Sequence, residues 1–210
     1  MKVEEFIHEL STGMLSNLAM GNDGEGVICD KYLGKLVRYV NQGLTRLHGL
    51  FALKSVLTTM PVTMGVSEYS PDIPRTLTIS RIFSQEDQMF LPINAENSQH
   101  GVLVGSDFKI TYVVPPVKDD VLILHRHLNH NEVTLASLGQ VLAIPDVLLE
   151  ALELFVIYKV YREINTVEAQ GISKQHEASF LSLVQSIQAG DLVSDSLISH
   201  SSKFSGRGWV

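Results

Sequence analysis

Cysteine, positive charge and long apolar runs are all scarce in this 210-residue chain. The single cysteine, Cys29, has no second cysteine to pair with, so nothing indicates an oxidising compartment. Lysine and arginine total 16 against 23 aspartates and glutamates, which gives a net charge of -7. A binder of DNA backbone or of an anionic membrane needs a basic face, so this charge argues against both functions.

The sequence also predicts neither a signal peptide nor a membrane-spanning helix. Residues Met1–Glu5 carry acids where a signal peptide needs positive charge. The longest uncharged apolar stretch in the helix predicted after Pro145 is Leu154–Tyr158, far short of the ~20 residues that span a bilayer. We therefore expect a soluble protein that is made in the cytoplasm and does not bind a membrane.

The composition is that of a globular protein, with 45% hydrophobic and 19% charged residues. A chain of this length buries about 70% of the surface that its unfolded form exposes. The sequence therefore predicts either one compact unit or two small ones, with a sizeable core.

Two amphipathic helices are predicted near the start, because apolar residues recur there at spacings of three and four. The first covers residues 3–20. A glycine-rich turn, Gly21–Gly26, follows it and lacks the context of a phosphate loop or an EF-hand. Asp30 is the predicted N-cap of the second helix, whose apolar face runs to Phe51.

The middle of the chain, from about Leu57 to Arg126, changes to period-two alternation. Strands with one buried face are predicted at residues 76–80 and 108–114, and a further strand at Val121–Leu124. The segments without alternation are predicted loops: Val66–Pro74 and Glu86–His100.

Helical spacing returns at Pro145, which is expected at the first helical position because its missing N–H would be unpaired there. The helix after it is apolar on nearly every side and should be central. A turn at Asn165–Gly171 leads to a fourth helix, Ser173–Gln188, which Gly190 can end. The residues predicted to point inward from this helix are Phe180, Leu181, Val184 and Ile187.

These elements predict an α+β fold. Residues 1–55 and 133–190 should form a helical domain that resembles a four-helix bundle. Residues 56–132 should form a small antiparallel β-domain inserted into it, and residues 191–210 an extended C-terminal tail.

The tail contains six serines and no helical or strand periodicity, so it cannot fold alone. Large aromatic side chains beside cations are good interface anchors, which favours docking onto a partner over a disordered end. The predicted partner-binding residues are Lys203, Phe204, Arg207, Trp209 and Val210.

Histidines form the one cluster that has a metal-ligating pattern, at His125, His127 and His130. Alternate histidines at a strand end can face one metal ion, as in metallo-β-lactamases. Here Asn129 stands where that motif has an aspartate, and no further ligand motif follows. Surface histidines at a subunit interface are the favoured interpretation, and a metal-dependent hydrolase is the alternative.

No other pattern predicts catalysis. Cys29 has no basic motif beside it. Asp119 and Asp120 are expected to face water in a turn between strands. The chain lacks the glycine pattern of a nucleophile elbow, so we expect neither catalytic residues nor a cofactor.

The order of elements and several C-terminal residues resemble the head-to-tail adaptor proteins of short-tailed phages. The matching features are a strand that ends in Tyr112-Val113-Val114-Pro115-Pro116, a leucine-rich approach to Pro145-Asp146, and a helix with Tyr158 and Tyr161 that precedes Phe180. The two N-terminal helices, the inserted β-domain and the polar tail follow the same pattern.

This resemblance implies a non-enzymatic virion protein at the neck between head and tail. Twelve copies would form a ring beneath the portal protein, extend its DNA channel and bind the tail tube or nozzle protein. The tail would dock on the portal, and DNA would pass through an acidic lumen without specific binding. The alternatives are a stopper or tail-completion ring of the neck, the hydrolase above, and a host-directed binding protein.

Overall fold

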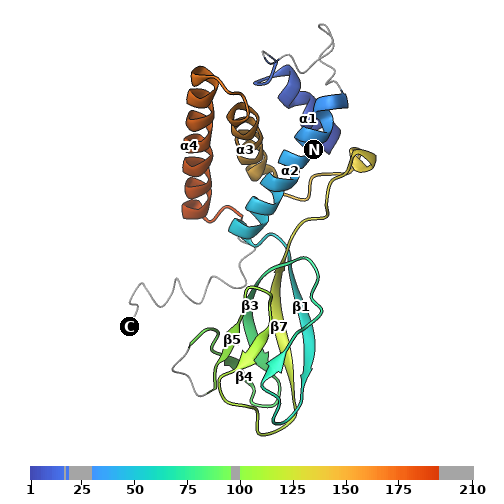
Figure 1. Ribbon diagram of the computed structural model, residues 1–210, viewed down its shortest axis with the longest axis vertical. Coiled ribbons are helices and arrows are strands. Elements are labelled where there is room, and N and C mark those ends of the chain that lie inside the picture. Colours follow the sequence, from blue (N-terminus) through green and yellow to red (C-terminus); the bar gives the residue numbers. More distant parts are fainter. Residues whose placement is uncertain (17, 19–29, 96–99, 194–210) are drawn as a thin grey trace. The chain divides into compact units, whose positions relative to one another are not determined.

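The computed structural model describes residues 1–16, 18, 30–95 and 100–193 (Figure 1). These residues form four α-helices and two antiparallel sheets, so the predicted α+β class is confirmed. The chain divides into two compact units. Met1–Phe51 and His130–Val210 form the helical unit, and Ala52–Asn129 form the β unit. Among the described helices, none combines the length and apolar character that a membrane span requires.

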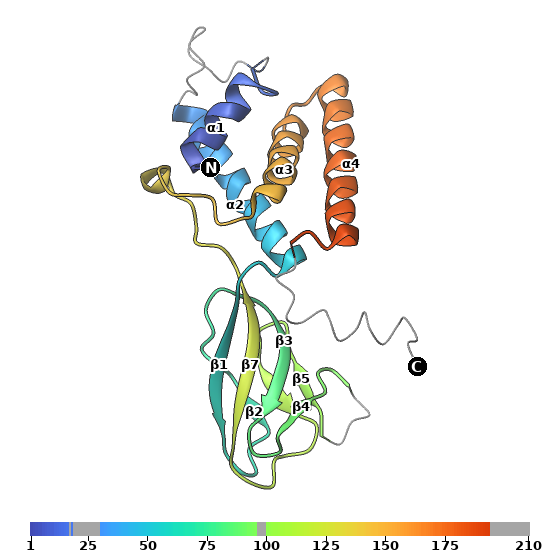
Figure 2. The same ribbon diagram turned by 180° about the vertical axis from the view of Figure 1, so that it is seen from behind.

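The helical unit is built around one nearly all-apolar helix. Its α-helices are α1 (Val3–Thr12), α2 (Asp30–Phe51), α3 (Leu149–Arg162) and α4 (Val167–Gly190), with 3-10 helices at Leu135–Ser137 and Asp146–Leu148. Helix α3 packs against both α2 and α4 (Figure 1 and Figure 2). Most of its side chains are buried, which confirms the prediction that it is central.

Helices α2 and α3 approach closely at Gly43. A Cβ atom added there would lie 2.5 Å from Leu152 Cδ1 and 3.0 Å from Phe155 Cδ1. A larger residue there would force the side chain of Leu152 to shift, so glycine lets α2 and α3 pack closely at this point without that adjustment.

The first helix is shorter than the predicted 3–20. It ends at Thr12, and Gly13 forms its C-cap by donating its N–H to Glu9 O. A Cβ at Gly13 would lie 2.9 Å from that oxygen, so glycine ends the helix although the apolar spacing continues. The predicted turn at Gly21–Gly26 lies outside the described residues, as does Cys29.

The later helix boundaries also differ from the predictions. Asp30 is already helical, and Pro145 is the N-cap of a 3-10 helix instead of the first helical residue. Helix α4 begins at Val167, inside the predicted turn, because Thr166 Oγ1 accepts a hydrogen bond from Ala169 N–H at 3.2 Å.

The inward face of α4 is predicted correctly for Phe180, Val184 and Ile187. The prediction is wrong for Leu181, whose side chain is 47% exposed. Gly190 is the last residue of the helix, and Asp191 takes the left-handed C-cap conformation with φ 55°.

The β unit holds two sheets (Figure 2). The four-stranded sheet has the order β1-β7-β3-β4 and the three-stranded sheet the order β2-β6-β5. The strands are β1 (Ser55–Val62), β2 (Glu68–Tyr69), β3 (Thr76–Ser84), β4 (Met89–Leu91), β5 (Val102–Val104), β6 (Ile110–Tyr112) and β7 (Asp120–Leu128). Buried residues of these strands, among them Ile82, Ile110 and Leu122, form one hydrophobic core.

Strand β7 is longer than the predicted Val121–Leu124 and pairs with β1 from Asp120 to His127. Strands β2 and β4 lie inside the two predicted loops, where they form short pairs with β6 and β3. The strand predicted at 108–114 is only β6, and Val114 is exposed outside it. Short strands are missed because two or three residues show no alternation; pairing with a neighbour defines them.

Candidate functional site

The predicted partner-binding residues Lys203, Phe204, Arg207, Trp209 and Val210 lie outside the described residues. The surfaces that the structure describes belong to the helical unit and the β unit.

The histidine cluster is divided between the two units. His125 and His127 do not follow the strand as predicted but lie within β7, and their rings pack edge to face at 5.5 Å between centroids. His125 Nδ1 is 3.1 Å from Ser80 Oγ on β3. His130 belongs to the helical unit.

His130 is a buried part of the helical core. Its Nδ1 lies 2.7 Å from Asn131 O, and its Nε2 lies 3.1 Å from Asn41 O and 3.2 Å from Thr45 Oγ1. These contacts satisfy both ring nitrogens. Within the described ranges, no three His, Cys, Asp or Glu side chains are arranged to hold a metal ion.

One face of the four-stranded sheet carries apolar side chains that the core does not cover. The register places Leu57, His125 and Arg81 in one cross-strand row, and Ile123, Phe83 and Phe90 in the next. Core residues alternate with them and point the other way. We define these six residues as the outer sheet face. Leu57 is 65% exposed and Phe90 is 57% exposed, although such large apolar side chains are usually buried.

Arg81 carries the one formal charge among the six residues of the outer sheet face, and it is positive. The Arg81 guanidinium lies 5.7 Å from the centroid of the Phe90 ring, which also packs edge to face on Phe83 at 5.3 Å. None of the residues that the four described strands direct to this face carries a carboxylate. Beside it, burial and the neighbouring His125 lower the pKa of His127.

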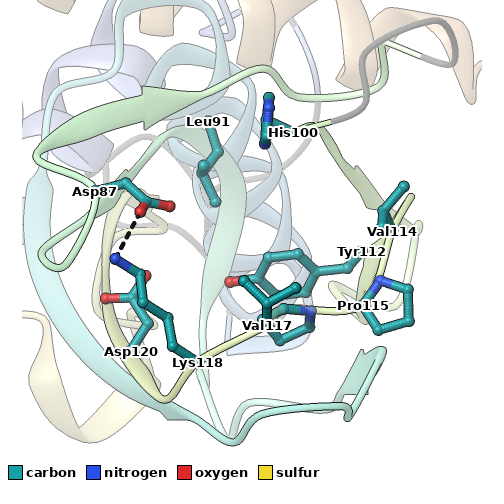
Figure 3. Close-up of a pocket in the computed structure, with 10 residues that line it drawn as sticks. Asp87, Leu91, His100, Tyr112, Val114, Pro115, Val117, Lys118 and Asp120 are labelled. Atoms are coloured by element: carbon teal, nitrogen blue, oxygen red, sulfur yellow. Dashed lines mark ion pairs between the residues drawn. The ribbon is translucent and has the colours of Figure 1, made fainter.

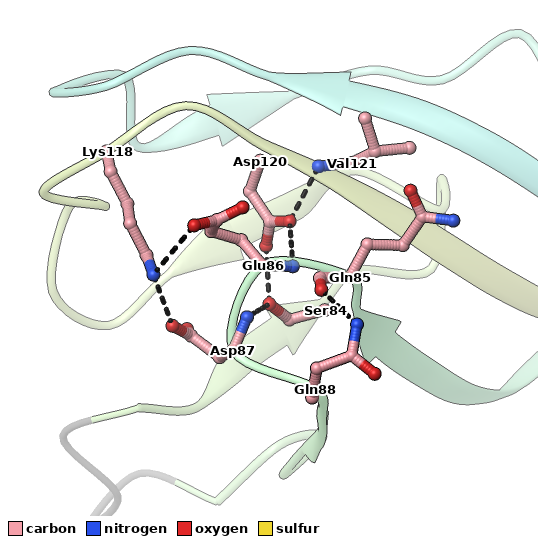
Figure 4. A network of polar contacts seen from close by, with 8 residues as sticks. All are labelled: Ser84, Gln85, Glu86, Asp87, Gln88, Lys118, Asp120 and Val121. Carbon is pink, nitrogen blue, oxygen red and sulfur yellow. Dashed lines mark hydrogen bonds and ion pairs between the residues drawn. The ribbon is translucent and has the colours of Figure 1, made fainter.

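Asp120 forms several hydrogen bonds on the opposite side of the sheet, where β3 ends and β7 begins (Figure 4). Its carboxylate accepts hydrogen bonds from Ser84 Oγ at 2.6 Å, Glu86 N–H at 2.9 Å and Val121 N–H at 2.6 Å. Asp119 Oδ1 accepts one from Met64 N–H at 2.7 Å. Asp119 is exposed, as expected, although its carboxylate also accepts this hydrogen bond. The expectation is wrong for Asp120, which lies in β7, is only partly exposed and accepts three hydrogen bonds.

Lys118 lies between two further acids of this turn region. Its Nζ is 3.4 Å from Glu86 Oε1 and 3.1 Å from Asp87 Oδ1 (Figure 4). The hydrogen bond to Asp87, ahead of other causes, raises the pKa of Lys118. The amine of Lys118 therefore stays protonated at neutral pH.

A pocket of about 480 Å³ opens beside these charges (Figure 3). We call it the β-unit pocket. Its lining residues come from β4, β6, the start of β7 and the connections β3–β4, β4–β5 and β6–β7: Asp87, Leu91, His100, Tyr112, Val114, Pro115, Pro116, Val117, Lys118 and Asp120. In Figure 3 the charged Asp87, Lys118 and Asp120 lie together, and Val114 and Pro115 lie away from them. Burial, then the charge of Asp120, raises the pKa of Tyr112, so its hydroxyl stays protonated.

The charged groups at the edge of the β-unit pocket are already bonded to neighbouring groups. Asp120 already holds three donors, and Lys118 is bonded to two acids. The apolar walls and the acidic edge suit an apolar side chain that ends in, or lies beside, a positive charge. The sequence signal was present in the stretch Tyr112–Pro116, but only the folded chain brings it beside β4.

The helical unit has a shallower pocket of about 410 Å³ among α2, α3 and α4. Lys159 Nζ lies 5.4 Å from the centroids of both Phe155 and Tyr158 and covers their rings. Burial, followed by the charge of Glu177, raises the pKa of Tyr158. These contacts lie within α3 and between α3 and α4, and they serve the packing of the helices.

Comparison with protein-family models and with curated proteins finds no match for this chain. The functional interpretation therefore depends on the residues and geometry of the chain.

Proposed function

We propose that this chain is a structural virion protein that forms the head-to-tail adaptor ring beneath a phage portal. One observation carries the proposal: both ends of the chain build the helical unit, and the β unit is formed by the segment between them. The finer architecture proposed is a helical bundle of α1–α4 with an inserted antiparallel β-domain and an extended C-terminal tail. This is the order of elements in the adaptor family that the sequence resembles.

The chemistry of the described surfaces supports a protein that assembles. In the β-unit pocket, Asp120 is bonded to Ser84 and Asp87 to Lys118, and the β unit exposes large apolar side chains, such as those of Leu57 and Phe90. Contiguous exposed apolar surface is typical of protein–protein contacts. We infer that the β unit contributes contacts within the virion.

The proposed partners are a portal protein above the ring, a tail tube or nozzle protein below it, and further copies of this chain. Twelve copies would match the symmetry of a portal. The net charge of -7 suits a lumen that repels the DNA backbone, so that DNA passes without binding. The proposed location is the neck of the virion, after synthesis in the host cytoplasm.

The test is co-purification with the portal protein encoded by the same genome, followed by imaging of rotational symmetry. Full-length chain is compared with a version that ends at Val193, which keeps the helix cap at Asp191, and with Trp209→Ala. A collar that forms with the full chain and fails without residues 194–210 supports the adaptor and its docking tail. A version that ends at Gly190 shows what loss of the cap adds.

Absence of any complex between the full chain and the portal overturns the adaptor proposal. Binding to the tail-side partner alone, without the portal, instead supports the stopper or tail-completion ring.

A further inference from the structure

The β unit presents two different surfaces on opposite sides of one sheet. Phe90 and Leu91 are neighbours on β4, so they point to opposite sides: Phe90 to the outer sheet face and Leu91 to the β-unit pocket. We propose that copies of this chain bind head to tail, the outer sheet face of one copy docking in the β-unit pocket of the next. Because it assigns the contacts within the ring, this inference rests on the proposed function.

The two surfaces match in their apolar character. The projecting group on the outer sheet face is the Phe90 ring, which is 57% exposed. The receiving walls include Val114, Pro115 and Val117, the last of which is 83% exposed. A volume of about 480 Å³ lies within the ~300–1,000 Å³ of ordinary ligand pockets, so it admits an aromatic side chain with neighbouring groups.

The two surfaces also match in charge, which favours a second copy as the occupant. The outer sheet face carries Arg81 beside the Phe90 ring and has His125 in the same cross-strand row as Arg81. The pocket is edged by Asp87 and Asp120, with Lys118 as a cation that Asp87 and Glu86 already pair. An aromatic ring beside a guanidinium is the group that apolar walls with an acidic edge would bind.

Docking between unlike surfaces is heterologous, and such contacts form closed rings when the rotation between copies closes. An isologous dimer would use one surface twice, which would bring Arg81 of two copies together. The charge distribution therefore favours a ring or chain of copies over a two-fold dimer.

The test blocks each surface separately in the full chain. Phe90→Glu places an acid on the face that would meet the acidic pocket, and Val117→Arg places a cation in the pocket that would meet Arg81. The matched controls are Val167→Glu and Val167→Arg on α4, where Val167 is 91% exposed. Self-association is measured by sedimentation, alone and with the portal protein, after thermal unfolding shows that each variant is folded.

Wild-type chain should form oligomers larger than dimers, alone or on the portal. Each blocking variant should raise the half-association concentration at least about tenfold, and the controls should not. An equimolar mixture of the two blocked variants should stop at dimers, because only one intact face and one intact pocket remain. Wild-type chain that stays monomeric in both settings, or a mixture that forms no dimer, overturns the docking.

Failure of this docking is distinguishable from failure of the proposed function. If the portal still binds the full chain while Phe90→Glu and Val117→Arg assemble like the wild type, the docking is wrong and the adaptor stands. If the copies associate as predicted and no portal complex forms, the adaptor is wrong and the docking stands.

Discussion

The helical unit and the β unit use their apolar residues differently. In the helical unit, α3 is buried between α2 and α4, and the buried Ser173 Oγ donates a hydrogen bond to Tyr158 O at 2.9 Å. The β unit has a core of its own but also directs Leu57 and Phe90 outward. The helical unit also exposes large apolar side chains, such as that of Val167, but Leu57 and Phe90 of the β unit lie in neighbouring cross-strand rows of one sheet. This difference supports the proposal that the β unit contributes contacts with other molecules.

The largest effect is expected when a buried leucine and an exposed leucine are each replaced by alanine. Leu152→Ala removes a fully buried side chain of α3 and should lower the free energy of unfolding by about 2–5 kcal/mol. Leu57→Ala on the outer sheet face should change it by no more than about 0.5 kcal/mol. Urea unfolding followed by circular dichroism checks both. Equal effects of the two substitutions would contradict the division of roles.

A second test asks whether the polar groups at the pocket also stabilise the β unit. Asp120→Asn weakens the acceptor of Ser84 Oγ and two backbone N–H groups and should cost about 1–3 kcal/mol. Hydrogen exchange should rise in β3 and β7, and not in α3. The exposed Asp72→Asn is the matched control. Unchanged exchange in β7 would mean that Asp120 does not hold this turn.

A smaller effect is expected at the start of α4. Thr166→Ala removes the side chain that accepts from Ala169 N–H and should cost about 1 kcal/mol, whereas Thr166→Ser should restore most of it. The loss should appear as faster exchange in the first turn of α4, with the β unit unchanged. Spread of the effect into β7 would show that the two units do not unfold separately.

The smallest expected effect is on the pH dependence of stability. Burial lowers the pKa of His127 in the β unit and of His176 in the helical unit below the ordinary 6.5. The unfolded chain then binds more protons than the folded chain in this range, so stability is full above pH 6.5 and falls as the pH drops below it. The Nδ1 atom of His127 is buried without a hydrogen-bond partner among the described residues, which accounts for the desolvation.

His127→Gln should remove part of this acid sensitivity from the β unit, and His176→Gln part of it from the helical unit. Thermal unfolding between pH 7.5 and pH 5 measures both. A wild-type stability that rises on acidification would show that the sign is wrong.

Local periodicity was enough to predict the four helices and the strands at 76–80 and 121–124, because one buried face repeats over several residues. It also predicted that α3 is central, since a helix without a polar face must be covered on several sides. It failed at Thr12, where glycine ends the helix, and in β1, β2 and β4, where pairing decides the structure.

The sequence by itself thus determined the α+β class and the buried residues of long elements, since these depend on the spacing of neighbours in the chain. Only the tertiary structure decided that His130 belongs to a different unit from His125 and His127, and that Tyr112 and Val114–Pro116 line a pocket with Asp87. The same holds for the outer sheet face, which combines residues of β1, β3, β4 and β7. Such groupings depend on strand order and register, which long-range packing sets and local spacing does not encode.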